Sequence, residues 1–297
     1  MSYWFGVAGW SYPDWKGIVY PTSRPKRFDE LAYIAQYFDV IELNNTFYRI
    51  PDARMADSWV KRVAHNPRFQ FTVKLWQGFT HEKKKTEASE VAQFKNAIAP
   101  LQNADKLGAL LVQFPSSFRR SNEAAERLKE ITLQFAEFPV VVEFRNRSWI
   151  ADEVLSWLEE NGIGFCNVDE PLFREMIRPS SLVTGLTAYV RFHGRNYKNW
   201  FSKEANRDAR YDYLYSEQEL DEWIPRIQEM ERKAKKVYVI GNNHFRGQAP
   251  ANILQLKSKT IREPVEVPQS LMDSFPELRK IGKTRAKRSK QPGLFDE

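Results

Sequence analysis

Eight short segments of the chain begin with apolar residues and end with polar ones, and their length and content of β-branched and aromatic residues are typical of strands. They are YWFGVAGWS (3–11), FDVIELNNT (38–46), FQFTVKLWQ (69–77), GALLVQFPS (108–116), PVVVEFRNR (139–147), GIGFCNVDE (162–170), TAYVRFHGR (187–195) and KVYVIGNNH (236–244). Stretches with helical spacing separate most of them. A strand followed by a helix, repeated eight times, predicts parallel strands that close into a single α/β (β/α)8 TIM barrel.

Three of the stretches between the strands carry clear helix signals. In residues 27–38, apolar side chains from Leu31 to Phe38 recur at the spacing of one helix face. Ser121 is placed as an N-cap, and Ser216 opens a helix with a glutamate three residues later, which is a capping box. These signals predict helices on the outside of the barrel.

The remaining stretches define the expected domain organisation. PLFREMIRPSSLVTG (171–185) contains two prolines and a glycine, which predicts a loop with a short helix. We therefore expect the barrel to span residues 1–261, an extension to span 262–282, and a flexible, disordered basic tail to span 283–297.

Alternation along each strand predicts which side chains point into the barrel, because successive residues of a strand face opposite sides. The apolar set should contact the outer helices, so the mixed set should point inward and end at the carboxyl-terminal mouth, where enzymes of this fold have their active sites. The expected inward set contains Glu42 and Asn44; Thr72, Lys74 and Trp76; Leu111 and Gln113; Val141, Glu143 and Arg145; Phe165, Asn167 and Asp169; Tyr189, Arg191 and His193; and Asn242 and His244.

Five motifs in these segments resemble those of the YecE-like family, which is catalogued as domain of unknown function number seventy-two. They are AGWSYPDW, IELNNTFYRIP, VEFRNRSW, VRFHGR and GNNHFRGQAPANI, and the resemblance extends in order over residues 3–257. It implies a TIM barrel, in agreement with the strand pattern. It implies no reaction, because none is assigned to the family.

Composition and the absence of targeting segments indicate the compartment in which we expect the protein. The 297 residues carry a formal net charge of +7. The tail holds five basic and two acidic residues and so contributes +3, which leaves +4 for the body. The single cysteine, Cys166, cannot form an internal disulfide. We find no signal peptide and no apolar run of membrane-spanning length, so we expect a cytoplasmic protein with no membrane partner.

The polar mouth residues allow two interpretations of the charges. In the first, guanidinium and ammonium groups bind a phosphate or carboxylate ligand, and neighbouring amides orient it. In the second, Glu42, Glu143 and Asp169 form internal ion pairs with the three cations, because an unpaired buried charge is costly. The candidate ligand-binding residues are Asn44, Asn45, Lys74, Arg145, Arg191, Asn242, Asn243 and His244.

The candidate catalytic residues are Glu42, Glu143, Asp169 and His193. His193 is the better general-base candidate, since its ordinary pKa is near neutral, whereas a basic setting keeps the carboxylates ionised. A divalent-metal site is a further alternative, but the mouth supplies few histidines for one, and His65 is expected at the surface. The cofactor and any metal therefore stay unknown.

Two segments point to macromolecular partners. The stretch 193–215 mixes basic and aromatic residues, and it is either a lid over the mouth or a stacking surface for nucleic acid. QPGLF (291–295) resembles the pentapeptide by which bacterial polymerase and repair proteins bind the sliding clamp. Gln291, Leu294 and Phe295 match that motif, and the resemblance implies the clamp as a partner.

Two functional hypotheses remain open at this stage. The protein is an enzyme on nucleic acid or another phosphate-bearing substrate, such as a nuclease- or phosphoester-type hydrolase, recruited to DNA by the clamp. Alternatively, it is a non-catalytic clamp-associated protein that retains a barrel pocket for an anionic small molecule.

Overall fold

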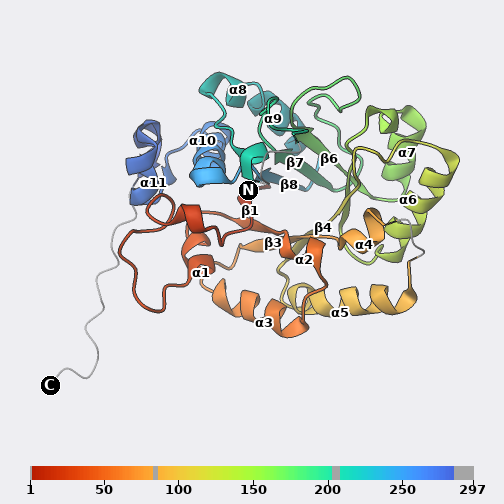
Figure 1. The fold of residues 1–297 in the computed structure, drawn as a ribbon, viewed down its shortest axis with the longest axis horizontal. Coiled ribbons are helices and arrows are strands. Elements are labelled where there is room, and N and C mark those ends of the chain that lie inside the picture. Colours follow the sequence, from red (N-terminus) through yellow and green to blue (C-terminus); the bar gives the residue numbers. More distant parts are fainter. Residues whose placement is uncertain (1, 83–85, 203–207, 284–297) are drawn as a thin grey trace.

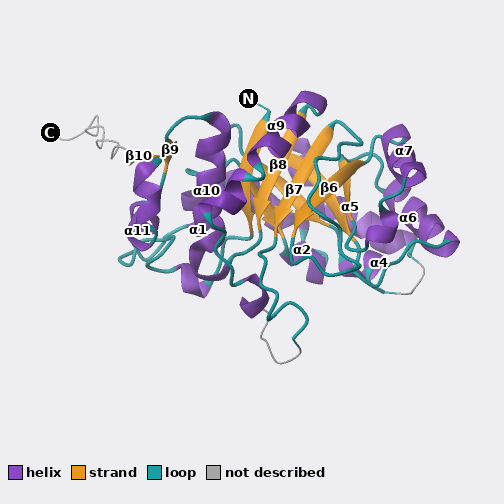
Figure 2. Ribbon diagram, turned by 90° about the horizontal axis from the view of Figure 1, so that it is seen from above, coloured by secondary structure: helices purple, strands orange, loops and turns teal. Residues whose placement is uncertain are grey.

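Eight parallel strands close into a barrel in sequence order, as predicted (Figures 1 and 2). The structure is a computed structural model that describes residues 2–82, 86–202 and 208–283. The strands are β1 (Tyr3–Ala8), β2 (Val40–Leu43), β3 (Gln70–Lys74), β4 (Leu107–Gln113), β5 (Val140–Glu143), β6 (Gly164–Asp169), β7 (Thr187–Phe192) and β8 (Lys236–Gly241). β8 pairs with β1 in parallel from Tyr3↔Val237 onward, which closes the barrel.

Helices surround the strands on the outside (Figure 2). The longer ones are α3 (Ala53–Arg62), α5 (Ala88–Asn103), α6 (Asn122–Gln134), α7 (Asp152–Glu160), α9 (Ile224–Lys233) and α10 (Gln248–Ile261). The shorter ones are α1 (Glu30–Ile34), α2 (Asn45–Tyr48), α4 (Gln77–Thr80), α8 (Glu217–Asp221) and α11 (Gln269–Ser274). Single 3-10 turns are η1 (Pro13–Trp15), η2 (Arg147–Trp149), η3 (Asp208–Tyr211), η4 (Phe245–Gly247) and η5 (Pro276–Lys280).

The helix signals are confirmed at the caps and need correction at the boundaries. The Ser121 hydroxyl accepts from the backbone N–H of Ala124, and the capping box at Ser216 is present. The helix predicted over 27–38 is shorter, because α1 begins only after the cap of Asp29. The helix expected after Ser216 is divided at Trp223 into α8 and α9, and a proline occupies the first turn of α9.

The stretch 171–185 contains no helix, so the short helix predicted there is wrong. The Asn167 side chain instead holds this loop: its Nδ2 donates to Leu182 O at 2.9 Å, and its Oδ1 accepts from Leu182 N at 2.9 Å. An amide on β6 therefore replaces the backbone hydrogen bonds that a helix would have made.

The barrel interior is built in layers of paired side chains from β3 and the strands opposite. Near the amino-terminal end, Tyr238 OH on β8 donates to Gln70 Oε1 at 2.5 Å. One layer higher, the hydroxyls of Thr72 and Tyr189 lie 2.7 Å apart. The next inward residue of β3 is Lys74, so the layering places its ammonium group at the mouth.

One glycine allows the close approach of β1 to β2. A Cβ on Gly6 would lie 1.8 Å from the carbonyl oxygen of Val40. No side chain can occupy that space, so the register between these strands depends on glycine at this position.

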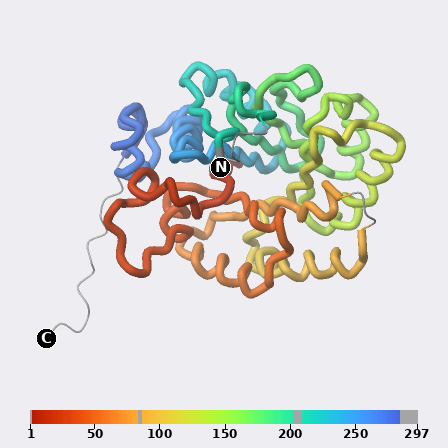
Figure 3. The backbone as a smooth tube through the Cα atoms, viewed as in Figure 1, coloured from red at the N-terminus to blue at the C-terminus, as the bar shows by residue number. Residues whose placement is uncertain are grey.

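The extension after the barrel packs beside α10 and the amino-terminal loop (Figures 1 and 3). It contains α11, η5 and a two-stranded parallel pair, β9 (Val265–Glu266) and β10 (Gly282–Lys283). The Ser270 hydroxyl donates to Val19 O at 3.0 Å. Lys283, the first residue of the expected tail, belongs to β10. The predicted motif at Gln291, Leu294 and Phe295 lies outside the described residues.

Candidate functional site

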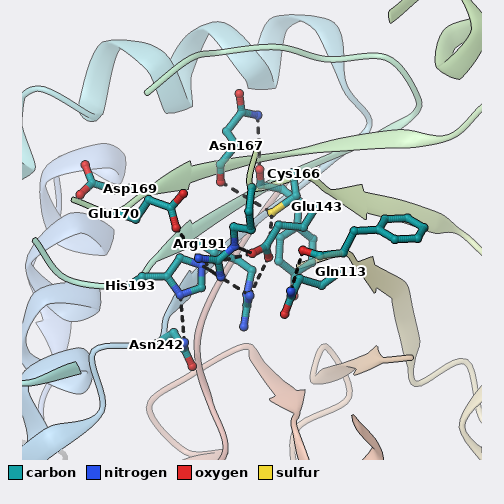
Figure 4. Close-up of polar contacts among 12 residues, drawn as sticks. Gln113, Glu143, Cys166, Asn167, Asp169, Glu170, Arg191, His193 and Asn242 are labelled. Atoms are coloured by element: carbon teal, nitrogen blue, oxygen red, sulfur yellow. Dashed lines mark hydrogen bonds and ion pairs between the residues drawn. The ribbon is translucent and has the colours of Figure 1, made fainter. Parts of the chain in front are cut away.

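A buried arginine joins two carboxylates inside the barrel near the carboxyl ends of the strands. Figure 4 shows this arginine, Arg191, with one of the two carboxylates, Glu143. Arg191 on β7 places Nη2 2.6 Å from Glu42 Oε1 on β2 and Nη1 2.6 Å from Glu143 Oε2 on β5. The side chains of Arg191, Glu42 and Glu143 are 2%, 0% and 0% exposed. Tyr189 OH donates to the second Glu42 oxygen at 2.9 Å. Both terminal nitrogens of Arg191 are therefore bound to carboxylates of the protein itself.

A second arginine extends this network toward the mouth. Arg145, just after β5, donates from Nε to Glu143 and from Nη1 to Glu170. Its Nη2 lies 2.9 Å from His193 Nε2. A guanidinium can only donate, so His193 Nε2 must accept, and the ring is neutral with its proton on Nδ1. The Asn242 side-chain amide lies 3.0 Å from that Nδ1, and with the ring proton there the amide oxygen must be the atom that faces it and accepts.

The pKa values follow from burial and from these arginines. Burial alone would raise the pKa of Glu143, but Arg145 and Arg191 outweigh burial and hold this pKa well below its usual range. Burial raises the pKa of Glu170 to about 7, against the opposing effect of Arg145. Burial, followed by the charges of Arg145 and Arg191, holds the pKa of His193 well below its ordinary value. His193 therefore has neither the basicity nor the free lone pair of a general base.

Lys74 is the cation that this network leaves out. Its Nζ lies 3.7 Å from the centre of the Phe47 ring on α2. In the described part of the chain, its ammonium group makes no ion pair and no hydrogen bond, and Asn44 Oδ1 nearby is likewise buried without a hydrogen-bond partner. Burial, followed by the charge of Arg191, lowers the pKa of Lys74 to about 7.

A cavity of about 240 Å³ opens above Lys74 at the barrel mouth. It is lined by Tyr12, Asn44, Phe47, Tyr48, Lys74, Gln113, Arg145, Arg191, Arg210, Tyr211, Asn242 and His244. Four of these residues are basic, and none of the described residues that line the cavity is acidic. A second cavity of about 300 Å³, which Asn45 lines, shares Tyr12, Asn44 and Tyr48 with the first.

The inward face predicted for the sixth strand is wrong. In Figure 4 the Asp169 side chain points away from Arg191 and Glu143. It lies in the outer layer, where its carboxylate binds Arg195 at 2.9 and 2.7 Å, Tyr215 OH at 2.7 Å and Trp223 Nε1 at 2.7 Å. The inward set of β6 contains Cys166, whose Sγ lies 3.7 Å from Glu143 Oε2. Both faces of β6 are buried, so polarity does not mark the inner one. Asp169 is thus not a mouth residue, and Glu170, which was not predicted, contacts Arg145 there.

Matches to known proteins now place the chain among its relatives. The model of the family described as "Protein of unknown function DUF72" matches residues 4–275.

The chain belongs to the DUF72 family.

The UPF0759 protein YunF of Bacillus subtilis (strain 168) is 32% identical over 267 residues, which cover 85% of this chain and 93% of that protein. The crystal structure of a DUF72 family protein from Thermotoga maritima MSB8 has a TM-score of 0.77 and 36% identity, and covers 89% of this chain and 100% of that one. A DUF72 family structure from Enterococcus faecalis V583 has a TM-score of 0.78 and 28% identity, and covers 89% and 97%. The family resemblance of the motifs is confirmed.

The other predicted residues of this DUF72 chain divide into two groups. Asn242 and His244 line the cavity, and the His244 ring stacks on Tyr12 with their centres 4.4 Å apart. Asn243 lies elsewhere: its Nδ2 donates to Tyr213 O at 2.9 Å and Asn252 Oδ1 at 3.0 Å, so it holds the loop after β7. Asn243 is therefore a structural residue and not part of the cavity.

The loop after β7 lies over the mouth, as the lid interpretation requires. Trp200 packs against His193 with their ring centres 6.3 Å apart, and Tyr211 packs against His244 at 5.2 Å. Arg210 and Tyr211 line the cavity from this loop, although neither was among the candidate site residues. Strand alternation cannot locate loop residues, so the mixed basic and aromatic composition was the available signal. Residues 203–207 of the loop lie outside the described residues.

Three further findings bear on the expectations from sequence. Among the residues with described positions, no three His, Cys, Asp or Glu side chains are arranged to hold a metal ion. Of the helices in the described ranges, none is both long and apolar enough to cross a membrane. His65 is exposed, as expected.

Proposed function

We propose that the mouth cavity binds a small phosphate-bearing anion and that the protein is an enzyme acting on a substrate of this class. The observation that carries the proposal is the charge of the lining: Lys74, Arg145, Arg191 and Arg210 face the cavity, with no carboxylate among its described lining residues. Phosphate oxygens are strong acceptors that match such donors.

The internal ion pairs limit which cations bind the ligand. Arg145 and Arg191 already donate to Glu42, Glu143 and Glu170. Most of their donors are therefore occupied, although Arg191 Nε is buried without a hydrogen-bond partner. Lys74 and Arg210, which have no ion pair among the described residues, are the groups that would contact the anion directly. In this proposal, the ion-pair interpretation holds for Arg145 and Arg191, and the ligand-binding interpretation holds for Lys74 and Arg210.

The size of the cavity favours a small ligand. Its volume of about 240 Å³ lies below the roughly 300–1,000 Å³ typical of sites for drug-sized molecules. Asn44 Oδ1 is a buried acceptor without a partner, so it is suited to receive a hydrogen bond from a ligand hydroxyl. A sugar phosphate or a single nucleotide unit has both chemical features.

Calorimetric titration with inorganic phosphate tests the proposal. Lys74→Met should weaken binding about 10- to 100-fold, because a charge-assisted hydrogen bond contributes roughly 1.5–3 kcal/mol. Lys233→Met is the matched control, since Lys233 pairs with Glu229 on the outer helix α9. Sulfate, whose charge is constant above pH 5, should bind more weakly as pH rises through about 7 and Lys74 loses its proton. Absence of phosphate binding to the intact protein would refute the anion site.

A nucleic acid is the second candidate ligand, and exposed aromatic side chains favour it. Tyr48 at the cavity is 55% exposed, and Tyr197 and Phe201 in the loop over the mouth are 52% and 56% exposed. Each base stacked on such a ring contributes about 1–3 kcal/mol. Tyr197→Ala/Phe201→Ala should reduce the affinity for a single-stranded oligonucleotide, measured by fluorescence anisotropy. Leu133→Ala, at an equally exposed apolar position on α6, should not. Equal binding by both variants would exclude stacking at this rim.

The tail motif supplies the proposed partner, the bacterial sliding clamp. We propose that Gln291, Leu294 and Phe295 bind the clamp as an extended peptide, with Leu294 and Phe295 in an apolar pocket. Burying two such side chains contributes about 1.5–3 kcal/mol each, and ordering the tail consumes part of this. Affinity should be on the order of micromolar. A tail peptide and its Leu294→Ala/Phe295→Ala form would be compared in a clamp pull-down, and equal retention would exclude docking. Clamp binding without turnover of any phosphate-bearing substrate would favour the non-catalytic alternative.

A further inference from the structure

Lys74 has no acceptor in the described structure, whereas three other lysines that are at least partly buried each have one. Lys106 donates to the carbonyl oxygens of Asn66 and Pro67 at 3.1 and 2.8 Å. Lys257 pairs with Asp39 at 3.0 Å, and Lys259 pairs with two carboxylates at 2.8 Å. Lys74 instead places its amine against the face of an aromatic ring, inside a cavity. An amine in that position is available to a ligand as a nucleophile as well as a cation.

The surroundings of Lys74 favour its neutral form. The amine is partly removed from water, Arg191 repels its proton, and the pKa is lowered to about 7. An ordinary lysine has a pKa of about 10.4, so the neutral fraction at pH 7 is on the order of a thousandfold greater for Lys74. The Phe47 ring attracts the ammonium form, but a single contact of this kind is too weak to reverse the direction of the pKa shift. Desolvated lysines next to a second cation are the type that form Schiff bases.

The cavity also supplies what a phosphorylated carbonyl compound needs around the reacting amine. Arg210 lines it from the loop over the mouth, and Arg145 and Arg191 line it from the barrel. Asn44 Oδ1, buried and without a partner, lies on the side of α2. A ligand with a phosphate, a hydroxyl group and a carbonyl carbon would engage these groups together.

We propose that Lys74 Nζ forms an imine with the carbonyl carbon of a sugar phosphate bound at the mouth. The neutral amine attacks the carbonyl carbon and forms a carbon–nitrogen bond. The carbonyl oxygen then leaves as water, and uptake of one proton gives the iminium ion. No oxidant or reductant is required. This inference rests on the proposed anion site. It adds that the bound ligand carries a carbonyl carbon with which Lys74 reacts. A free sugar phosphate and the ring-opened abasic sugar of DNA both carry a phosphate group and a carbonyl carbon.

Borohydride trapping tests this step, because hydride converts the iminium to a stable secondary amine. The intact protein would be incubated with 2-deoxyribose 5-phosphate in one arm and an oligonucleotide containing an abasic site in another, and then treated with sodium borohydride. We expect a mass increase equal to the aldehyde less one oxygen atom, mapped by peptide mass spectrometry to Lys74. The arm that gives this adduct identifies the source of the sugar. 2-Deoxyribose without phosphate should react at least tenfold less.

Two variants make the result decisive. Lys74→Arg keeps the positive charge for anion binding but cannot form an imine, so it should bind phosphate and lose the adduct. Lys106→Arg removes a second low-pKa lysine at the start of β4 and should leave the adduct unchanged. If the wild type binds phosphate but forms no Lys74 adduct in either arm, the imine is refuted and the anion site stands. If Lys74→Arg is labelled as much as the wild type, the reaction is non-specific and the proposal is also refuted. If phosphate does not bind and no adduct forms, both proposals fail.

Discussion

Replacing Lys74 with methionine should stabilise the folded protein at neutral pH, although it removes a residue of the proposed site. The ammonium group is disfavoured in the folded state, since burial and Arg191 lower its pKa to about 7. An unfolded chain has a lysine pKa of about 10.4. A difference of about three pH units corresponds to about 4 kcal/mol of penalty on the folded state. Methionine has a similar length and carries no charge.

The expected gain is smaller than that upper limit. The Lys74 side chain is partly exposed to the cavity, so solvent screens its charge. The favourable contact with the Phe47 ring is also lost. We therefore expect a gain of about 1–3 kcal/mol in the free energy of unfolding, or roughly 3–10 °C in melting temperature.

The pH dependence of this stability gain tests whether the lowered pKa of Lys74 causes it. A lysine with a lowered folded-state pKa imposes its full penalty below pH 7, where it is protonated in both states. Between about pH 7 and 10.4 the unfolded state binds more protons, so the stability of the wild type rises with pH and the advantage of Lys74→Met shrinks. Urea unfolding followed by tryptophan fluorescence at pH 6, 7.5 and 9 measures this trend.

One control and one outcome decide the interpretation. Lys106→Met should not stabilise, because it leaves the carbonyl oxygens of Asn66 and Pro67 without their donor. If Lys74→Met is instead less stable than the wild type at pH 7, Lys74 forms a stabilising ion pair with Glu42 or Glu143. The distinction between paired arginines and an unpaired lysine would then be wrong.

Three further substitutions test the remaining structure. Arg191→Met should cost about 3–5 kcal/mol in urea unfolding at pH 7, because it leaves Glu42 and Glu143 buried without their shared cation; the cost should shrink toward pH 4 as Glu143, whose low pKa depends in part on Arg191, takes up a proton, and a cost below about 1 kcal/mol at pH 7 would contradict the geometry. Asp169→Asn should cost about 2–4 kcal/mol while the phosphate affinity in calorimetry stays unchanged, and a loss of affinity would return Asp169 to the site. Gly6→Ala should destabilise by more than about 3 kcal/mol in the same unfolding assay, because its Cβ would overlap the Val40 carbonyl; a near-neutral effect would mean that β1 and β2 separate easily.

The spacing of apolar residues was sufficient to predict the barrel, because each strand segment ends in a polar cluster and each outer helix has one apolar face. Alternation also placed Glu42, Lys74, Glu143 and Arg191 on the inner face, since on those strands the outward neighbours are uniformly apolar. β6 is different. Its inward residue Cys166 is classed as apolar, whereas its outward residues Asn167 and Asp169 bind a loop and Trp223 at the start of α9. A strand buried on both faces gives no polarity signal for its inner side.

The sequence could not show which cation is paired with which carboxylate, because pairing depends on side-chain geometry between distant strands. In the ion-pair interpretation, three acids balance three bases, with Asp169 as the third acid. In the structure Glu170 replaces Asp169, and Lys74 stays outside the pairs. Strand alternation likewise could not predict loop residues such as Arg210, because side chains in a loop do not follow a regular repeat.

The buried ion pairs and the unpaired lysine are best understood as one arrangement. A buried arginine held by two carboxylates is seldom the most stable way to fill a core, because apolar side chains of the same volume often do as well. Here the pairs fix Arg191 close enough to Lys74 to disfavour its proton, and they fix Arg145 in the cavity wall. Glu42, Glu143 and Glu170 neutralise the arginines without entering the cavity lining, so the two guanidinium groups can face the cavity although they are paired. We therefore propose that Glu42 and Glu143, which the sequence suggested as catalytic groups, act one step back by holding the arginine that lowers the pKa of Lys74.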